Sequence, residues 1–189
     1  ADIEAVRARS EPGCHLFGHS YGGRVVLGAA AGADVASVTV YEPVLMGTPG
    51  LSGPAAVESA DAARALDDTA LLRELIDYWG GEGAWERLPE PHRGFYLAQA
   101  PRIRAEVVSL ALDDTTPAEL MASLSCPVHV IRGDYGHTGA ECMTDALHAA
   151  GAGLTILADL GHMGPLTGPR RVVLAVKDGP DIVPGRGTR

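Results

Sequence analysis

Four short apolar runs stand out along the chain, and turn-forming residues follow each of them. They lie at residues 14–17, 35–41, 127–132 and 154–157. Nearly continuous apolar character over so few residues is typical of parallel strands that are covered on both faces. Segments with helical patterning lie at residues 2–9, 24–31 and 140–150 and after Pro169. The pattern therefore predicts an α/β fold with a mostly parallel sheet and helices on both faces.

The middle of the chain has a different pattern, with no convincing strand between residues 47 and 124. A charged amphipathic stretch covers residues 61–79, and helical patterning returns at residues 91–112. We therefore expect a helical insertion within one core. The predicted parts are a first core half at residues 1–46, the insertion at 47–124, a second core half at 125–177 and a frayed, Pro- and Gly-rich tail at 178–189.

The sequence GHSYGG at residues 18–23 lies between a predicted strand and a predicted helix. In that context the pattern G-x-S-x-G indicates a sharp turn that exposes a serine hydroxyl, here that of Ser20. We expect a strained backbone at Ser20, and we expect Gly18 and Gly22 to keep Cβ atoms away where strand and helix come close. The helix that follows would direct its N-terminal N–H groups toward an oxyanion formed there.

A serine nucleophile needs a base within hydrogen-bonding reach. His162 fits this requirement, because it lies in the Gly-flanked segment LGHMG after the last predicted strand. If the loops at Ser20 and His162 leave the same edge of a parallel sheet, they converge at the carboxyl ends of the strands.

With these segments the sequence resembles the α/β-hydrolase superfamily. The resemblance rests on GHSYGG, on YEP at the end of the next strand, on PVHVIRGD and on LGHMGPL, and it extends from about Asp2 to about Pro169. It implies a partial α/β-hydrolase fold with a helical cap insertion. It also implies that Ser20 is the nucleophile, that His162 is the base and that the backbone N–H of Tyr21 is an oxyanion-hole donor.

The sequence offers two candidates for the acid that orients the histidine. The superfamily commonly has an aspartate three residues after the glycine that closes the penultimate strand, but Gly136 stands there. Asp134 lies one residue after Gly133, and Glu42 lies at the end of the strand after the elbow, where some relatives carry a carboxylate. Glu42 is slightly favoured, because Asp134 has the wrong offset.

The superfamily usually has several strands before the elbow, and the printed sequence begins at the helix that precedes it. We expect a carboxyl-terminal piece of a longer protein, with an exposed sheet edge through which copies of the chain could associate. The loop that normally supplies the second oxyanion donor lies in the missing strands, so we expect weak activity from this chain alone.

Substrate contacts are expected from the insertion and from the loops around the site. The candidates are His19, Met46, Trp79, Trp85 and Met163. An alternative for the aromatic residues is that the insertion packs on itself, and His19 could instead form hydrogen bonds within the elbow. The expected function is hydrolysis of an ester of a small apolar substrate, and C–C bond hydrolysis or haloperoxidase-like chemistry would use much the same residues. A different class of function is a hydrolase-derived module that binds without catalysis.

Charge and cysteine content limit the classes of partner and site that we expect. With 15 Lys+Arg against 24 Asp+Glu the formal charge is −9, which disfavours nucleic acid and anionic membranes. Three cysteines form no CxxC pair, so neither a disulfide framework nor a structural zinc site is indicated, and a cytoplasmic location fits best. The reaction implied by the resemblance needs no metal or organic cofactor.

Overall fold

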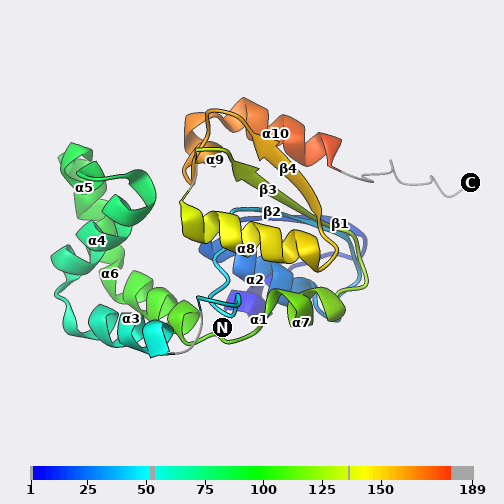
Figure 1. Cartoon of the computed structure of the whole chain (residues 1–189), viewed down its shortest axis with the longest axis horizontal. Helices are drawn as coiled ribbons and strands as arrows, with labels where there is room; N and C mark the ends of the chain where they lie inside the picture. Colours follow the sequence, from blue (N-terminus) through cyan, green and yellow to red (C-terminus); the bar gives the residue numbers. More distant parts are fainter. Residues whose placement is uncertain (1, 52–53, 136, 180–189) are drawn as a thin grey trace, which may run out of the picture. The chain divides into compact units, whose positions relative to one another are not determined.

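In the computed structural model, which describes residues 2–51, 54–135 and 137–179, the four predicted runs form one parallel sheet (Figure 1). The strands are neighbours in chain order, and all three pairs are parallel. They are β1 (Cys14–His19), β2 (Val35–Tyr41), β3 (Val128–Gly133) and β4 (Gly153–Leu157). The predicted α/β fold class is therefore confirmed.

Helices cover both faces of this sheet. α2 (Tyr21–Ala30) and α8 (Thr138–Ala149) lie on one face, and α10 (Pro169–Asp178) lies on the other (Figure 1). Right-handed crossovers between parallel strands place α2 and α8 on the same face. The short helices α1 (Asp2–Arg7) and α7 (Pro117–Ala122) pack on α2 and α8, and α9 (Gly164–Thr167) leads into α10.

The core follows from the alternation of side chains along the two central strands. Tyr41 of β2 and Ile131 of β3 face α10 and pack there with Val172, Ala175 and Leu160. Residues of the opposite parity, such as Val40 and Val130, are fully buried on the other face. Burial on both faces explains why the sequence of β2 is almost continuously apolar.

The chain divides into two compact units, and each is described by itself. The core unit comprises Ala1–Val44 and Pro117–Arg189, and the helical unit comprises Leu45–Thr116. The helical unit starts two residues before the expected insertion at residues 47–124. It also ends earlier, because α7 belongs to the core unit, where Pro117 and Leu120 are buried. The predicted tail lies outside the described residues from residue 180 onward.

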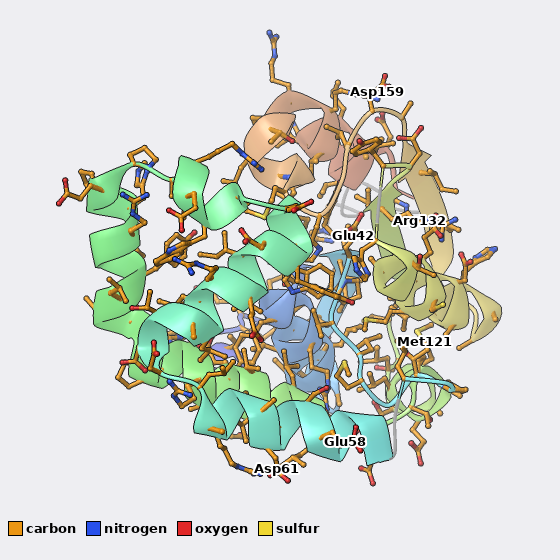
Figure 2. All side chains as sticks on the ribbon, turned by 60° about the vertical axis from the view of Figure 1, so that its left-hand side comes forward. Glu42, Glu58, Asp61, Met121, Arg132 and Asp159 are labelled. Carbon is orange, nitrogen blue, oxygen red and sulfur yellow. The ribbon has the colours of Figure 1, made fainter. Side chains whose placement is uncertain are left out.

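The described residues of the helical unit form helices joined by turns and loops, with no strand. The helices are α3 (Pro54–Ala65), α4 (Asp68–Gly80), α5 (Ala84–Arg87) and α6 (Glu90–Ala111). The amphipathic stretch at residues 61–79 is thus two helices, because the Asp67 side chain accepts a hydrogen bond of 3.0 Å from the Ala70 N–H and caps α4. Glu58 and Asp61 on α3 are exposed to solvent (Figure 2).

Trp85 lies in the small core of the helical unit. The residue is 3% exposed and clusters with Leu72 and Ala100, and its backbone N–H donates a hydrogen bond of 2.7 Å to the Asp77 carboxylate. This burial favours the packing alternative for Trp85 over substrate contact.

Among the described residues, no helix has both the length and the apolar character needed to cross a membrane.

β1 and α2 approach each other most closely at Gly18. A Cβ at Gly18 would overlap the carbonyl group of Gly22 and lie 2.7 Å from Cγ2 of Val26. A Cβ at Gly22 would meet no atom within 4 Å, so the prediction that Gly22 is needed for close approach is wrong. Gly23 has that role instead, since a Cβ there would lie 2.7 Å from Cβ of Pro43. The helical phase turns Gly23, not Gly22, toward the segment after β2.

The contrast between these glycines can be measured. We expect Gly22→Ala to raise the free energy of unfolding by roughly 0.5–1 kcal/mol, because alanine favours the helix and the space is open. We expect Gly18→Ala to lower it, because the new methyl group forces β1 and α2 apart. Urea unfolding followed by circular dichroism measures both, and equal effects of the two substitutions would contradict the packing described.

Trp85 should stabilise the helical unit through burial. We expect Trp85→Ala to lower the free energy of unfolding by about 3–5 kcal/mol, because it leaves a cavity beside Leu72 and Ala100. Phe95→Ala on the same unit is the matched control: Phe95 is 63% exposed, and its loss should cost less than about 1 kcal/mol. Denaturant unfolding compares the two variants, and a Trp85→Ala loss as small as that of Phe95→Ala would rule out the packing role.

Candidate active site

The turn at Ser20 connects β1 to α2 and has the strained backbone that the sequence predicts. Ser20 has φ 54° and ψ −125°, in a region that L-residues rarely adopt. Its N–H donates to the carbonyl of Tyr41 (3.1 Å), and its carbonyl accepts from the N–H of Gly23 (2.9 Å). The first bond holds the turn against the end of β2, and the second closes the turn onto the start of α2. The Ser20 side chain does not cap α2, so its hydroxyl is available for another partner.

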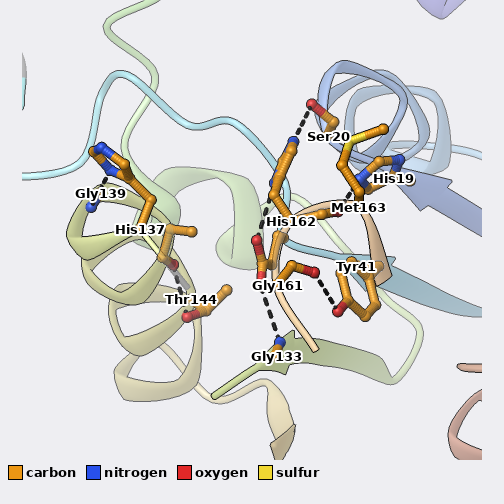
Figure 3. Close-up of polar contacts among 12 residues, drawn as sticks. His19, Ser20, Tyr41, Gly133, His137, Gly139, Thr144, Gly161, His162 and Met163 are labelled. Carbon is orange, nitrogen blue, oxygen red and sulfur yellow. Dashed lines mark hydrogen bonds and ion pairs between the residues drawn. The ribbon is translucent and has the colours of Figure 1, made fainter. Parts of the chain in front are cut away.

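That partner is His162, which lies 142 residues further along the chain (Figure 3). Nε2 of His162 lies 3.0 Å from Oγ of Ser20. On its other side, Nδ1 of His162 lies 2.9 Å from Oε2 of Glu42. The structure therefore joins a hydroxyl, an imidazole and a carboxylate in one hydrogen-bonded series.

Glu42 is held firmly at the end of β2. It is 1% exposed, and its backbone lies in the left-handed region with φ 39°. Its Oε1 accepts a hydrogen bond of 2.9 Å from the N–H of Gly133, at the end of β3. Both carboxylate oxygens are thus bonded, which offsets the cost of burying the group.

Asp134, the other candidate acid, occupies a different position. Its backbone N–H bonds to the carbonyl of Leu157 (3.0 Å), and the residue is exposed. Within the part of the chain that the structure describes, no hydrogen bond joins the Asp134 side chain to His162. Of the two carboxylates that the sequence leaves open, the structure brings Glu42 to the histidine.

Two further side chains contact the loop that carries His162. Nε2 of His19 lies 2.8 Å from the carbonyl oxygen of His162, and the two rings lie 4.8 Å apart. Burial, with a smaller contribution from His162, lowers the pKa of His19 from 6.5 to about 4. The hydroxyl of Tyr41 donates to the carbonyl of Gly161 (2.8 Å), and burial followed by the charge of Glu42 raises the pKa of Tyr41 well above its ordinary value.

The N-terminus of α2 lies directly after Ser20. Tyr21 is the first residue of this ten-residue helix, so its N–H belongs to the positive end of the helix dipole. The hydroxyl of Tyr21 donates to Oδ2 of Asp2 on α1 (2.7 Å), which anchors this side chain. The backbone here can stabilise negative charge that develops beside Ser20.

The other predicted contact residues are divided between the units. Met163 follows His162 in the core unit and is half-buried, as is His19. Met46 and Trp79 belong to the helical unit and are also half-buried, whereas Trp85 is buried in that unit's core. Substrate contact by these residues stays a prediction.

A metal site needs several ligating side chains close together. In the described ranges, no group of three or more His, Cys, Asp and Glu side chains is arranged to hold a metal ion.

Sequence reasoning missed the Gly133 N–H that holds Glu42 and the contacts from His19 and Tyr41 to the histidine loop. The one available signal is that these two side chains directly precede Ser20 and Glu42.

Comparison with known proteins places this geometry in a family. Residues 1–176 match the family model described as Alpha/beta hydrolase family. A search of curated proteins found no match.

Solved structures share the fold at low sequence identity. A bromoperoxidase from Bacillus anthracis is 16% identical with a TM-score of 0.68, over 93% of this chain and 71% of that one. A hydrolase from Pseudomonas aeruginosa PA01 is 22% identical with a TM-score of 0.67, over 92% and 67%. A lipase-esterase related protein from Clostridium acetobutylicum ATCC 824 is 18% identical with a TM-score of 0.65, over 94% and 73%. The family model covers nearly the whole chain, and the chain belongs to the alpha/beta hydrolase family.

Proposed function

We propose that this protein hydrolyses carboxylic esters through a covalent acyl intermediate on Ser20. The observation that carries the proposal is the series from Ser20 Oγ to His162 Nε2 and from His162 Nδ1 to Glu42. A serine hydroxyl becomes nucleophilic when a base accepts its proton, and the base works when a third group orients it.

The Glu42 carboxylate sets the state of the imidazole. As an acceptor it favours a proton on Nδ1 of His162, which leaves the Nε2 lone pair directed at the Ser20 hydroxyl. The bond from Gly133 keeps the carboxylate from rotating away. When the hydroxyl proton moves to Nε2, the resulting imidazolium lies beside a carboxylate, which stabilises it.

The first half of the reaction transfers the acyl group. Oγ of Ser20 attacks the ester carbonyl carbon while Nε2 of His162 takes its proton, and the carbonyl oxygen becomes an oxyanion. The N–H of Tyr21, at the start of α2, stabilises that charge. The intermediate collapses with cleavage of the C–O bond, and the alkoxide leaves as the alcohol with the proton from His162.

The second half releases the acid. A water molecule gives a proton to Nε2 of His162 and attacks the acyl carbon, and a second tetrahedral intermediate forms. Its collapse breaks the bond to Oγ, which recovers the proton from His162. The cycle consumes one ester and one water and yields one acid and one alcohol, with the protein unchanged.

A small, largely apolar ester is the proposed substrate. An esterase from Exiguobacterium antarcticum has a similar fold at 12% identity, which is consistent with an ester as the group that is cleaved. A module that binds without catalysis is not favoured, because a strained serine and a buried carboxylate are costly features for a fold to retain without a use.

Active-site labelling tests the nucleophile. We expect a fluorophosphonate probe to label the chain at Ser20 and Ser20→Ala to abolish labelling. We also expect Ser20→Ala to lower hydrolysis of p-nitrophenyl acetate by at least about 10³-fold. Ser123→Ala is the matched control, because its hydroxyl donates to the carbonyl of Leu120, three residues earlier in the chain. Absence of labelling in the unaltered chain, or labelling that survives Ser20→Ala, would contradict the proposal.

A pair of isosteric substitutions tests the acid. Glu42→Gln keeps the shape but removes the carboxylate that orients His162, so we expect a fall in kcat of about 10³- to 10⁴-fold. Asp134→Asn should change kcat by less than about threefold, since Asp134 does not bond to His162. Steady-state kinetics with p-nitrophenyl acetate compares the two, and effects of similar size would remove the assignment of Glu42.

A further inference from the structure

The loop that carries His162 is attached to the sheet at its backbone as well as at its imidazole. Nε2 of His19 bonds to the carbonyl of His162 (2.8 Å), and the Tyr41 hydroxyl bonds to the carbonyl of Gly161 (2.8 Å) (Figure 3). Two consecutive peptide carbonyls are therefore held by side chains from two different strands. Such bonds limit how far the imidazole can move from Ser20.

The two donors occupy equivalent places on adjacent strands. His19 is the last residue of β1 and Tyr41 is the last residue of β2, and they are paired in the β1–β2 register. Their rings meet edge to face with centroids 5.7 Å apart. Ser20 follows one donor and Glu42 follows the other. The two residues that hold the loop of the base thus directly precede the nucleophile and the acid.

The protonation states suit donation by both groups. The ring of His19 lies beside the rings of His162 and Tyr41 and is influenced by the charge of Glu42. Its lowered pKa keeps the ring neutral near pH 7, so one ring nitrogen carries an N–H to donate. A neutral ring also avoids repulsion with a proton on His162. The raised pKa of Tyr41 keeps its hydroxyl protonated.

The shape of the loop accommodates these contacts. A Cβ at Gly164 would overlap the Tyr41 hydroxyl, so this glycine leaves the space that the phenol occupies. The N–H of Gly164 also bonds to the Gly161 carbonyl (2.8 Å), which closes the loop into a turn. The loop is therefore built around the donors, and His19 holds the one carbonyl that belongs to the base itself.

We propose that His19 is a positioning residue for the reaction assigned to Ser20, an inference that rests on the proposed function. Its Nε2–H fixes the His162 carbonyl, so the imidazole spans the distance between Glu42 and Ser20. His19 takes no part in bond making. Removing its donor widens the range of imidazole orientations and reduces the fraction of bound substrate that is aligned for attack.

Three substitutions separate the hydrogen bond from the bulk of the ring. His19→Gln places an amide N–H close to the position of the ring Nε2–H, whereas His19→Asn is one methylene too short to reach. His19→Phe keeps a ring and has no donor. His148→Phe is the matched control: it removes another imidazole bond to a backbone carbonyl, from Nδ1 to Ala152 (2.7 Å), at the end of α8.

Kinetics with p-nitrophenyl acetate gives the first readout. We expect His19→Asn and His19→Phe to lower kcat by about 10- to 100-fold with KM changed less than twofold. We expect His19→Gln to recover kcat to within about fivefold of the unaltered chain and His148→Phe to match it. Equal losses in the Gln and Asn variants, or a change in KM alone, would overturn the proposal.

Proton NMR gives a second readout that does not depend on catalysis. The Nδ1–H of His162, bonded to Glu42, should give a downfield resonance that His162→Gln removes. We expect this signal to broaden in His19→Asn and His19→Phe and to persist in His19→Gln and His148→Phe. An unchanged signal in His19→Asn would overturn the positioning role. If probe labelling and hydrolysis both fail in the unaltered chain, the proposed function fails, and the NMR comparison still decides whether His19 positions the loop.

Discussion

The buried hydrogen bond between Glu42 and His162 is the constraint on which the site depends. A carboxylate that is removed from water is costly unless its oxygens are bonded. Both carboxylate oxygens of Glu42 are bonded, Oε2 to Nδ1 of His162 and Oε1 to the N–H of Gly133. Glu42 follows β2, Gly133 ends β3 and His162 lies in the loop after β4. The bonds can form only if β2 and β3 pair in the observed register and the loop after β4 returns to their ends.

Backbone strain is the cost of this arrangement. Ser20 and Glu42 both have positive φ, and each directly follows one of the paired residues His19 and Tyr41. Such conformations cost of order 1–3 kcal/mol each for residues other than glycine. Positive φ at neighbouring strand ends accompanies a hydroxyl and a carboxylate that both bond to the same imidazole. The bond from the Ser20 N–H to the Tyr41 carbonyl couples the two turns, so the strain at one is supported by the other.

The sequence predicts the strands more completely than the site. The apolar run of β2 identifies it to the residue, because a strand buried on both faces has little freedom in composition. Ser20 and His162 are recognisable because glycines flank them. Glu42 and Asp134 cannot be distinguished in this way, since the choice depends on which carboxylate meets the Gly133 N–H in three dimensions. The roles of Gly22 and Gly23 depend on helical phase, which spacing within a motif does not reveal.

The electrostatics of the cluster favour proton transfer in one direction. The imidazole of His162 lies between a carboxylate and a hydroxyl, and the neighbours that hold its loop, His19 and Tyr41, are neutral at pH 7. The charge of Arg171 lowers the pKa of Tyr41, but this effect is smaller than the opposing effects of burial and of Glu42. A proton that moves from Ser20 to His162 therefore meets an anion on the far side of the ring and neutral hydrogen-bond donors at its backbone. In a site of low dielectric constant, charges and dipoles fixed in advance stabilise the imidazolium without reorganisation during the reaction. The burial that makes Glu42 costly in the folded state is thus the same property that makes it effective beside the base.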